Sequence, residues 1–127
     1  KEVEIGGVKI LFLPWIPENN IDAMNASLEA IKNSKAQICM GHLELAGFEM
    51  ERGHLSQHGL SKSIFSKFEF VFSGHFHTKS QQDNIYYLGA PFEFTWGDYG
   101  TRKGFHVFDL RSRALEFVEN DCNEAPS

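Results

Sequence analysis

Two short apolar runs that each end in Gly-His constrain this chain more than any other feature of its sequence. The first run, Ile38-Cys39-Met40, leads into Gly41-His42, and the second, residues 68–72, leads into Ser73-Gly74-His75-Phe76-His77. A short and almost wholly apolar run predicts a strand that is buried on both faces of a layered α/β sheet. Ligands bind beyond the carboxyl ends of strands in such sheets, so both Gly-His segments are expected to share one site.

His42, His75 and His77 are therefore predicted to bind metal ions. Neutral imidazole is a good ligand for Mn, Fe and Zn. Two divalent ions roughly 3.5–4 Å apart can clamp a phosphodiester and activate the attacking water. An isolated His-x-His is more often a pair of loop histidines without metal, because short motifs match by chance. The second strand followed by Gly-His favours the metal interpretation and leaves the other open.

The remaining pattern predicts an α/β (α+β layered) domain, with a mixed sheet and flanking helices. Hairpins are expected at both ends of the chain, from strands 3–5 and 8–13 around Gly6-Gly7 and from strands 105–110 and 114–118. Between them we expect a helix from Asn20 or Asp22 to residue 33, a strand at 36–40, a short helix at 61–67, and strands at 70–73 and 85–88.

Two further details of this pattern can be checked against a structure. The long helix should bury one apolar stripe, formed by Ile21, Met24, Leu28 and Ile31. Residues 43–59, which hold three glycines, are predicted to be a loop, as are the polar residues 81–84.

Length and composition predict one domain, or part of one, over residues 1–119, followed by a frayed tail at 120–127. Hydrophobic residues make up 42% of the 127, no apolar run approaches the length that spans a membrane, and the charged start predicts no signal peptide. Cys39 and Cys122 are predicted to be free thiols in a reducing, cytoplasmic compartment. The net charge of −5 excludes a general nucleic-acid-coating protein but not a nuclease, whose metal ions supply positive charge.

Several other polar residues are predicted to have no special role. Lys79 and the pair Arg102-Lys103 are expected on solvated surface. Glu93 and Asp98 are possible carboxylate ligands, but we favour loop surface for both.

Histidines and aromatic residues outside the Gly-His segments allow two interpretations each. His54 is expected on the surface, and His106 is expected to be an outward strand residue or a core histidine with satisfied hydrogen bonds. Trp96 and Tyr99 could stack on DNA bases, as aromatic side chains do in single-strand grooves, but packing beneath a loop is the favoured interpretation.

The ordered set Gly41-His42, Gly74-His75-Phe76-His77 and Tyr87-Leu88-Gly89-Ala90-Pro91 resembles the second half of the calcineurin-like metallophosphoesterases. Within them the chain resembles the SbcD-type nucleases of double-strand-break repair, and in particular the recombination endonuclease subunits of T4-like bacteriophages. Residues 13–15 and Lys103-Gly104-Phe105 also look like pieces of those subunits, and the resemblance extends to about Leu110. It implies half of a four-layer metallophosphoesterase sandwich.

The resemblance also implies a function and a set of roles. His42 and His75 would bind one ion and His77 the other, and the two divalent ions are usually manganese in this family. His58, which is otherwise expected on the surface, would lie near the active site. Members of the family cut DNA as exonucleases or endonucleases in recombination and repair, together with an ABC-type ATPase subunit.

This chain lacks the family's first three motifs, which are Asp-x-His, a Gly-Asp that holds a bridging Asp, and Gly-Asn-His-Asp. The general-acid His and the bridging Asp are therefore expected in an N-terminal half, and the ATPase-docking segment is missing as well. We expect the C-terminal half of a phosphoesterase domain, whether an artificial fragment, a proteolytic remnant or a natural split product. Alone it should be inactive and should self-associate. The alternatives are a phosphoesterase of small phosphodiesters and a non-catalytic domain.

Overall fold

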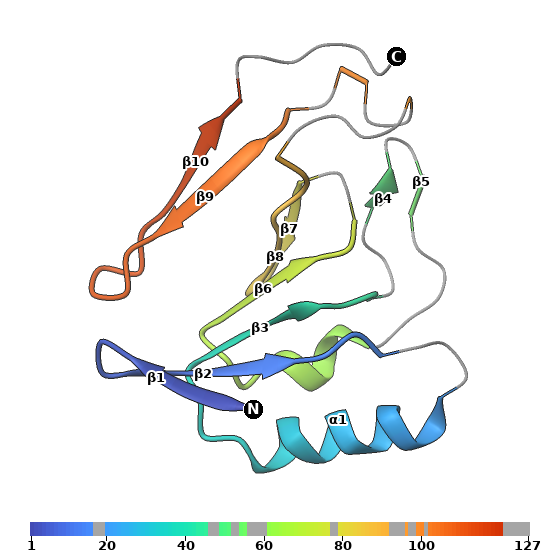
Figure 1. Cartoon of the computed structure of the whole chain (residues 1–127), viewed down its shortest axis with the longest axis vertical. Coiled ribbons are helices and arrows are strands. Elements are labelled where there is room, and N and C mark those ends of the chain that lie inside the picture. Colours follow the sequence, from blue (N-terminus) through green and yellow to red (C-terminus); the bar gives the residue numbers. More distant parts are fainter. Residues whose placement is uncertain are drawn as a thin grey trace.

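The computed structural model describes residues 1–16, 20–45, 49–51, 54–55, 61–76, 79–91, 96, 99–100 and 102–120. Its centre is a six-stranded sheet of order β1-β2-β3-β6-β8-β7 (Figure 1). The strands are β1 (Glu2–Ile5), β2 (Val8–Leu13), β3 (Ile38–His42), β6 (Phe70–Gly74), β7 (Ser80–Gln82) and β8 (Ile85–Tyr87). The four central strands are parallel, and β1 and β7 pair antiparallel at the two edges.

The other elements are two helices and two small sheets. The helices are α1 (Ile21–Asn33) and the 3-10 helix η1 (Lys62–Phe65). One small sheet pairs β4 (Glu49–Glu51) with β5 (His54–Leu55), and the other pairs β9 (Gly104–Phe108) with β10 (Leu115–Glu119). A mixed sheet with few helices confirms the predicted fold class and is consistent with half of a phosphoesterase sandwich. Among the described residues, no helix combines the length and the apolar character that crossing a bilayer requires.

Each face of the main sheet is covered by a different part of the chain. On the face that packs against α1 and η1, the buried residues include Leu11, Leu13, Ile31, Cys39, Phe65, Val71, Ile85 and Tyr87. On the opposite face, Val8, Ile10, Ile38 and Phe72 pack with Phe108, Leu110 and Leu115 of the β9–β10 hairpin. Alternation along each strand sends successive side chains into the two cores, as it must in a sheet covered on both sides.

Local chemistry explains where the first elements begin. Gly6 and Gly7 have φ angles of 57° and 81°, and a two-residue turn with both central residues left-handed suits the twist of the β1–β2 hairpin. The Asn20 side chain accepts a hydrogen bond of 2.9 Å from the Ala23 amide and so caps α1. Both elements lie where the sequence predicts them.

Helix α1 buries only part of the predicted stripe. Ile31 is buried as predicted and Met24 is half-buried, whereas Ile21 and Leu28 are exposed. Ser27, which was not predicted, is buried, and its small side chain allows close packing. The hydrophobic pattern was therefore wrong for Ile21 and Leu28.

Several short elements also differ from prediction. Strand β3 starts two residues later than expected and includes His42. The predicted helix at 61–67 is the shorter 3-10 helix η1. Part of the predicted loop at 43–59 forms the β4–β5 pair. Strand β7 takes the first two residues of the polar turn predicted at 81–84, and the last two form the turn. Strands of two or three residues are held by pairing with a neighbour, and periodicity within the sequence cannot reveal that.

Gly104 leads to the first prediction, which concerns stability. A Cβ atom at this position would lie 2.1 Å from the Val118 carbonyl oxygen across the β9–β10 pair. Gly104→Ala should destabilise the protein by about 3 kcal/mol or more, because backbone on both strands must move apart. Gly6→Ala is the control: its φ of 57° costs about 1 kcal/mol, with only ordinary contacts. Urea unfolding of both variants measures the difference, and equal losses would contradict the steric argument.

Candidate metal centre

The parallel pairing of β3 with β6 brings the two Gly-His segments together. His42 is in register with Gly74, the residue before His75. The centroids of the two imidazole rings are 5.1 Å apart and the ring planes lie at 83°. The two histidines thus meet at the carboxyl ends of neighbouring strands, where the sequence predicted a shared site. His77 and His58 lie outside the described residues.

Crowding explains why each histidine follows a glycine. A Cβ atom at Gly74 would lie 3.1 Å from Nδ1 of His42, and a Cβ atom at Gly41 would lie 3.1 Å from the Leu13 carbonyl oxygen. Side chains at either position would press on the site or on the neighbouring strand. The backbone of His75 has a φ of 91°, which is rare for a residue with a side chain and turns the chain sharply away from β6. Strain of this kind is often found at functional sites.

Trp15 is a third member of this cluster that the sequence analysis did not identify. Its ring stacks on His75 with centroids 4.7 Å apart and contacts His42 edge-on at 5.6 Å. The signal that could have identified it is positional. Trp15 lies two residues beyond β2, whose last residue, Leu13, is in register with Gly41. Residues just past three adjacent parallel strands should therefore meet, and Trp15 is 44% exposed, at the rim of the pair of histidines.

A buried hydrogen-bond network holds the turn that follows His42. The Leu43 amide donates to Oγ of Ser73 at 2.8 Å, and this hydroxyl donates to the Gly74 carbonyl at 2.8 Å. The Tyr87 hydroxyl donates to the Leu43 carbonyl at 2.5 Å and accepts from the Leu45 amide at 3.0 Å. Burial raises the pKa of Tyr87, so the hydroxyl keeps its proton and can donate. The network joins β6 and β8 to the segment that carries His42.

The two imidazoles supply part of a metal site. They come from separate strands, and their nearly perpendicular rings are in contact. Among the described residues, no group of three or more His, Cys, Asp or Glu side chains is placed to hold an ion. Protein sites for such metals use at least three protein ligands, so this pair fits a site that needs a further contributor.

Two of the three basic candidates differ from their predicted settings. Lys103, expected on the surface, is fully buried. Its neighbour Arg102 is exposed, as predicted, and bonded to Glu119 at 3.1 Å. Lys79 is half-buried over the ring of Phe117. A chain with several aromatic side chains near its lysines can bury their aliphatic stems, and charge alone does not reveal this.

The aromatic candidates and His106 also depart from the favoured interpretations. Trp96 and Tyr99 are 66% and 51% exposed and lie beside each other at 6.0 Å, rather than packing beneath a loop. His106 is half-buried, and its Nδ1 atom is buried without a hydrogen-bond partner among the described residues. It is thus neither an outward residue nor a satisfied core histidine.

The remaining candidates are the two cysteines, two carboxylates and His54. Cys39 is a free, buried thiol as predicted, and burial raises its pKa to about 12, which makes it a poor ligand or nucleophile. Glu93, Asp98 and Cys122 lie outside the described residues, as does the side chain of His54.

The network around Tyr87 leads to the second prediction. Tyr87→Phe removes the hydroxyl and leaves the buried carbonyl of Leu43 and amide of Leu45 without it, at a cost of about 2–4 kcal/mol. Tyr86→Phe, at the half-buried neighbour on the other face of β8, is the matched control and should change stability by about 0.5 kcal/mol or less. Chemical unfolding of both variants tests this, and equal effects would contradict the role of the network.

Comparison with known proteins gives one informative match. No protein-family model matches the chain. Over 119 residues, which are 94% of the chain, it is 39% identical to exonuclease subunit 1 of Enterobacteria phage T4. The chain spans 34% of the length of that relative. In sequence, therefore, this chain is similar to about a third of a phage exonuclease subunit.

Proposed function

We propose that this chain is part of a metal-dependent DNA nuclease of phage DNA metabolism, with exonuclease activity. The observation that carries the proposal is the pair formed by His42 and His75, at the ends of adjacent parallel strands in a chain similar to a phage exonuclease subunit. The proposal extends the resemblance to SbcD-type metallophosphoesterases, including a role in recombination and double-strand-break repair in the host cytoplasm. DNA is the proposed substrate.

The chain's own residues have defined roles in this proposal. His42 and His75 would hold one divalent ion and His77 the other, manganese being the proposed metal. Bound ions supply Lewis-acid chemistry at a phosphodiester. Trp15 packs against both imidazoles, so it orients their rings and shields one side of the pair from water. The hydrogen bonds of Ser73 and Tyr87 fix the backbone from which His42 projects. A second segment would supply the carboxylate ligands and the general acid.

The test uses the full reading frame that encodes this chain, assayed with Mn²⁺ on end-labelled linear DNA. Release of nucleotides from the ends, lost with a chelator, is the expected result. Nicking of circular DNA would indicate endonuclease activity instead. Hydrolysis of a small chromogenic phosphodiester without DNA cleavage would favour a phosphoesterase of small substrates. No hydrolysis of any of these, by a folded protein that binds Mn²⁺, would contradict the proposal and favour a non-catalytic domain.

The resemblance also supports a protein partner, an ABC-type ATPase subunit. Its docking segment is not recognisable in this sequence, so the test must use the full reading frame. Co-expression of that reading frame with a candidate ABC-type ATPase subunit should yield one complex by affinity purification. Separate elution of the two proteins at micromolar concentration would contradict this part of the proposal.

Exposed apolar residues on the β9–β10 hairpin lead to the third prediction, that the 127-residue chain self-associates. Phe105 and Val107 are 58% and 50% exposed on one face of β9, and the two-stranded sheet leaves edges open to pairing. Light scattering over a concentration series should detect dimers or larger species, and the double variant Phe105→Thr, Val107→Thr should reduce them. A monomer at high concentration would contradict the prediction.

A further inference from the structure

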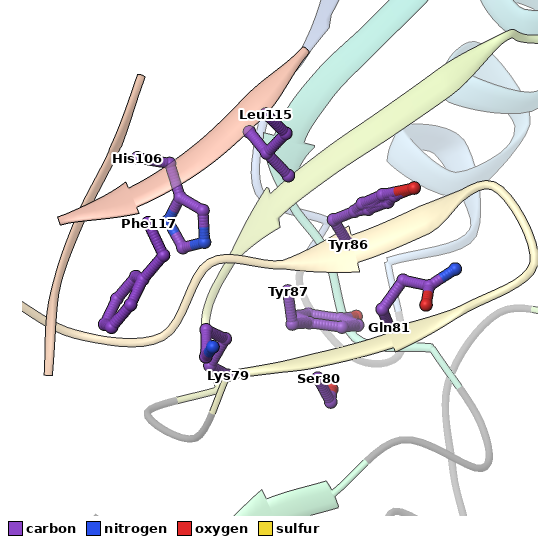
Figure 2. A pocket seen from close by; sticks show the side chains of 8 residues that line it. All are labelled: Lys79, Ser80, Gln81, Tyr86, Tyr87, His106, Leu115 and Phe117. Atoms are coloured by element: carbon purple, nitrogen blue, oxygen red, sulfur yellow. The ribbon is translucent and has the colours of Figure 1, made fainter. Parts of the chain in front are cut away.

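A pocket outside the histidine pair lies between the β7–β8 strands and the β9–β10 hairpin (Figure 2). Its volume is about 420 Å³, within the range of small-molecule sites. Lys79 and Ser80 line it from the start of β7, Tyr86 from β8, His106 from β9, and Leu115 and Phe117 from β10. The pocket thus lies between the main sheet and the β9–β10 sheet. Tyr87, whose hydroxyl holds the turn after His42, also lines it, but His42, His75 and Trp15 do not.

One buried polar atom on this face of the sheet, Nδ1 of His106, has no hydrogen-bond partner among the described residues. Oγ of Ser80 also has none, but Ser80 pairs with Tyr87 and its side chain therefore lies on the other face of the sheet. Buried polar atoms are nearly always hydrogen-bonded in proteins, and an exception calls for an explanation such as a ligand. Burial, and to a smaller extent the charge of Lys79, lower the pKa of His106, so its ring is neutral and offers one N–H donor.

Positive charge lies at the same end of the pocket. Nζ of Lys79 is 4.3 Å from the centre of the Phe117 ring, and the guanidinium of Arg102 is 5.3 Å from it. Arg102 also bonds to Glu119, whereas Lys79 makes no ion pair within the described part of the chain. Contact with the aromatic ring holds the ammonium in place without neutralising it. In a chain of net charge −5, a cation placed in this way beside the imidazole of His106 favours an anionic ligand.

The rest of the pocket is apolar and aromatic. Tyr86 and Leu115 form a wall away from Lys79, and Figure 2 shows both side chains on the far side of the cavity from the lysine. An ammonium and a ring N–H are donors suited to phosphate oxygens. An aromatic wall next to them suits a planar base, since every base has a π-face that can stack.

We propose that this pocket binds a single nucleotide, with its phosphate at Lys79 and His106 and its base against Tyr86 and Leu115. The proposal rests on the proposed nuclease function, for which a nucleotide is either the product or the end of the substrate strand. An acidic peptide would also use the donors, but it would leave the aromatic wall without a role.

The first experiment measures binding of thymidine 5′-monophosphate to the 127-residue protein by calorimetry, in EDTA so that no metal takes part. Thymidine and inorganic phosphate, each lacking half of the ligand, should bind about tenfold more weakly. Lys79→Met should weaken binding of the nucleotide about tenfold, through loss of a charge-assisted hydrogen bond. Lys9→Met, which removes an exposed charge on β2, is the matched control and should have no measurable effect.

A second variant separates binding from folding. His106→Phe replaces a buried nitrogen that lacks a partner with carbon, so the thermal midpoint should stay the same or rise. Nucleotide binding should weaken about fivefold or more. A lower midpoint with unchanged binding would overturn the proposal.

Three other outcomes would also overturn it. These are no binding at millimolar nucleotide, equal losses for Lys79→Met and Lys9→Met, and tighter binding of an acidic peptide than of the nucleotide. A 5′-phosphorylated tetranucleotide distinguishes the two sources of the ligand, because it binds as well as the mononucleotide only if the pocket accepts a strand end. Nucleotide binding without any DNA cleavage would leave the pocket assigned and the nuclease function rejected, so the two failures are distinguishable.

Discussion

His75→Gly in the full reading frame is expected to lower Mn²⁺-dependent DNA cleavage by about 10³-fold, because a metal ligand contributes several kcal/mol to the barrier. The same variant should keep or raise the unfolding temperature. A φ of 91° is less strained for glycine than for any residue with a side chain, so the substitution by glycine also relieves backbone strain. Cleavage of end-labelled DNA and thermal unfolding, measured on the same preparation, test both parts.

Two controls make this result specific to the imidazole. His75→Asn retains a polar side chain that tolerates left-handed backbone, and it should fold normally and cleave no better than the glycine variant. His42→Ala, on the adjacent strand, should lose activity to a similar degree, because the two rings are 5.1 Å apart and would serve one ion. Near-normal cleavage by His75→Gly would show that His75 is not part of the active site, whatever the unfolding temperature of the variant.

The isolated 127-residue chain is expected to show no detectable Mn²⁺-dependent cleavage, a reduction of at least about 10⁴-fold relative to an intact nuclease of this type. The reason is the number of ligands. Two imidazoles, or three with His77, cannot hold two divalent ions, and no described carboxylate is placed to join them. The comparison uses equal concentrations of the chain and of the full reading frame on linear DNA.

Contamination is the main risk in that comparison, so the His75→Gly form of the chain serves as its background. Cleavage by the isolated chain above this background, dependent on Mn²⁺, would contradict the ligand count. It would mean that residues outside the described part of the chain complete the site.

Residue patterns predicted the main elements of this fold because their causes are local. Gly6-Gly7 between two apolar runs fixes the β1–β2 hairpin, and Asn20 fixes the start of α1. Two apolar runs ending in Gly-His predicted adjacent parallel strands, and their pairing brings His42 and His75 together. These features depend on a few residues close in sequence, so one sequence is enough to find them.

Features that depend on distant partners could not be predicted in this way. Trp15 joins the histidines only because β2 pairs with β3, and Lys103 is buried only because of how its segment packs. The prediction of the buried face of α1 was wrong in part, because Ser27, a polar residue, is buried against the sheet. In each case the deciding contact involves a residue far away in the chain, and no periodicity encodes it.

The parallel centre of the sheet has a consequence for how the protein folds. Strands β2, β3, β6 and β8 pair only after the chain has crossed over between them, through α1 in the first case. Such non-local pairings require loop closure before they give stabilisation, which slows folding. The β1–β2 and β9–β10 hairpins can form early, but His42 and His75 meet only when β3 and β6 pair. A partly folded chain in which β3 and β6 have not paired therefore cannot assemble the histidine pair, and any ligand that needs both rings can bind only after this pairing.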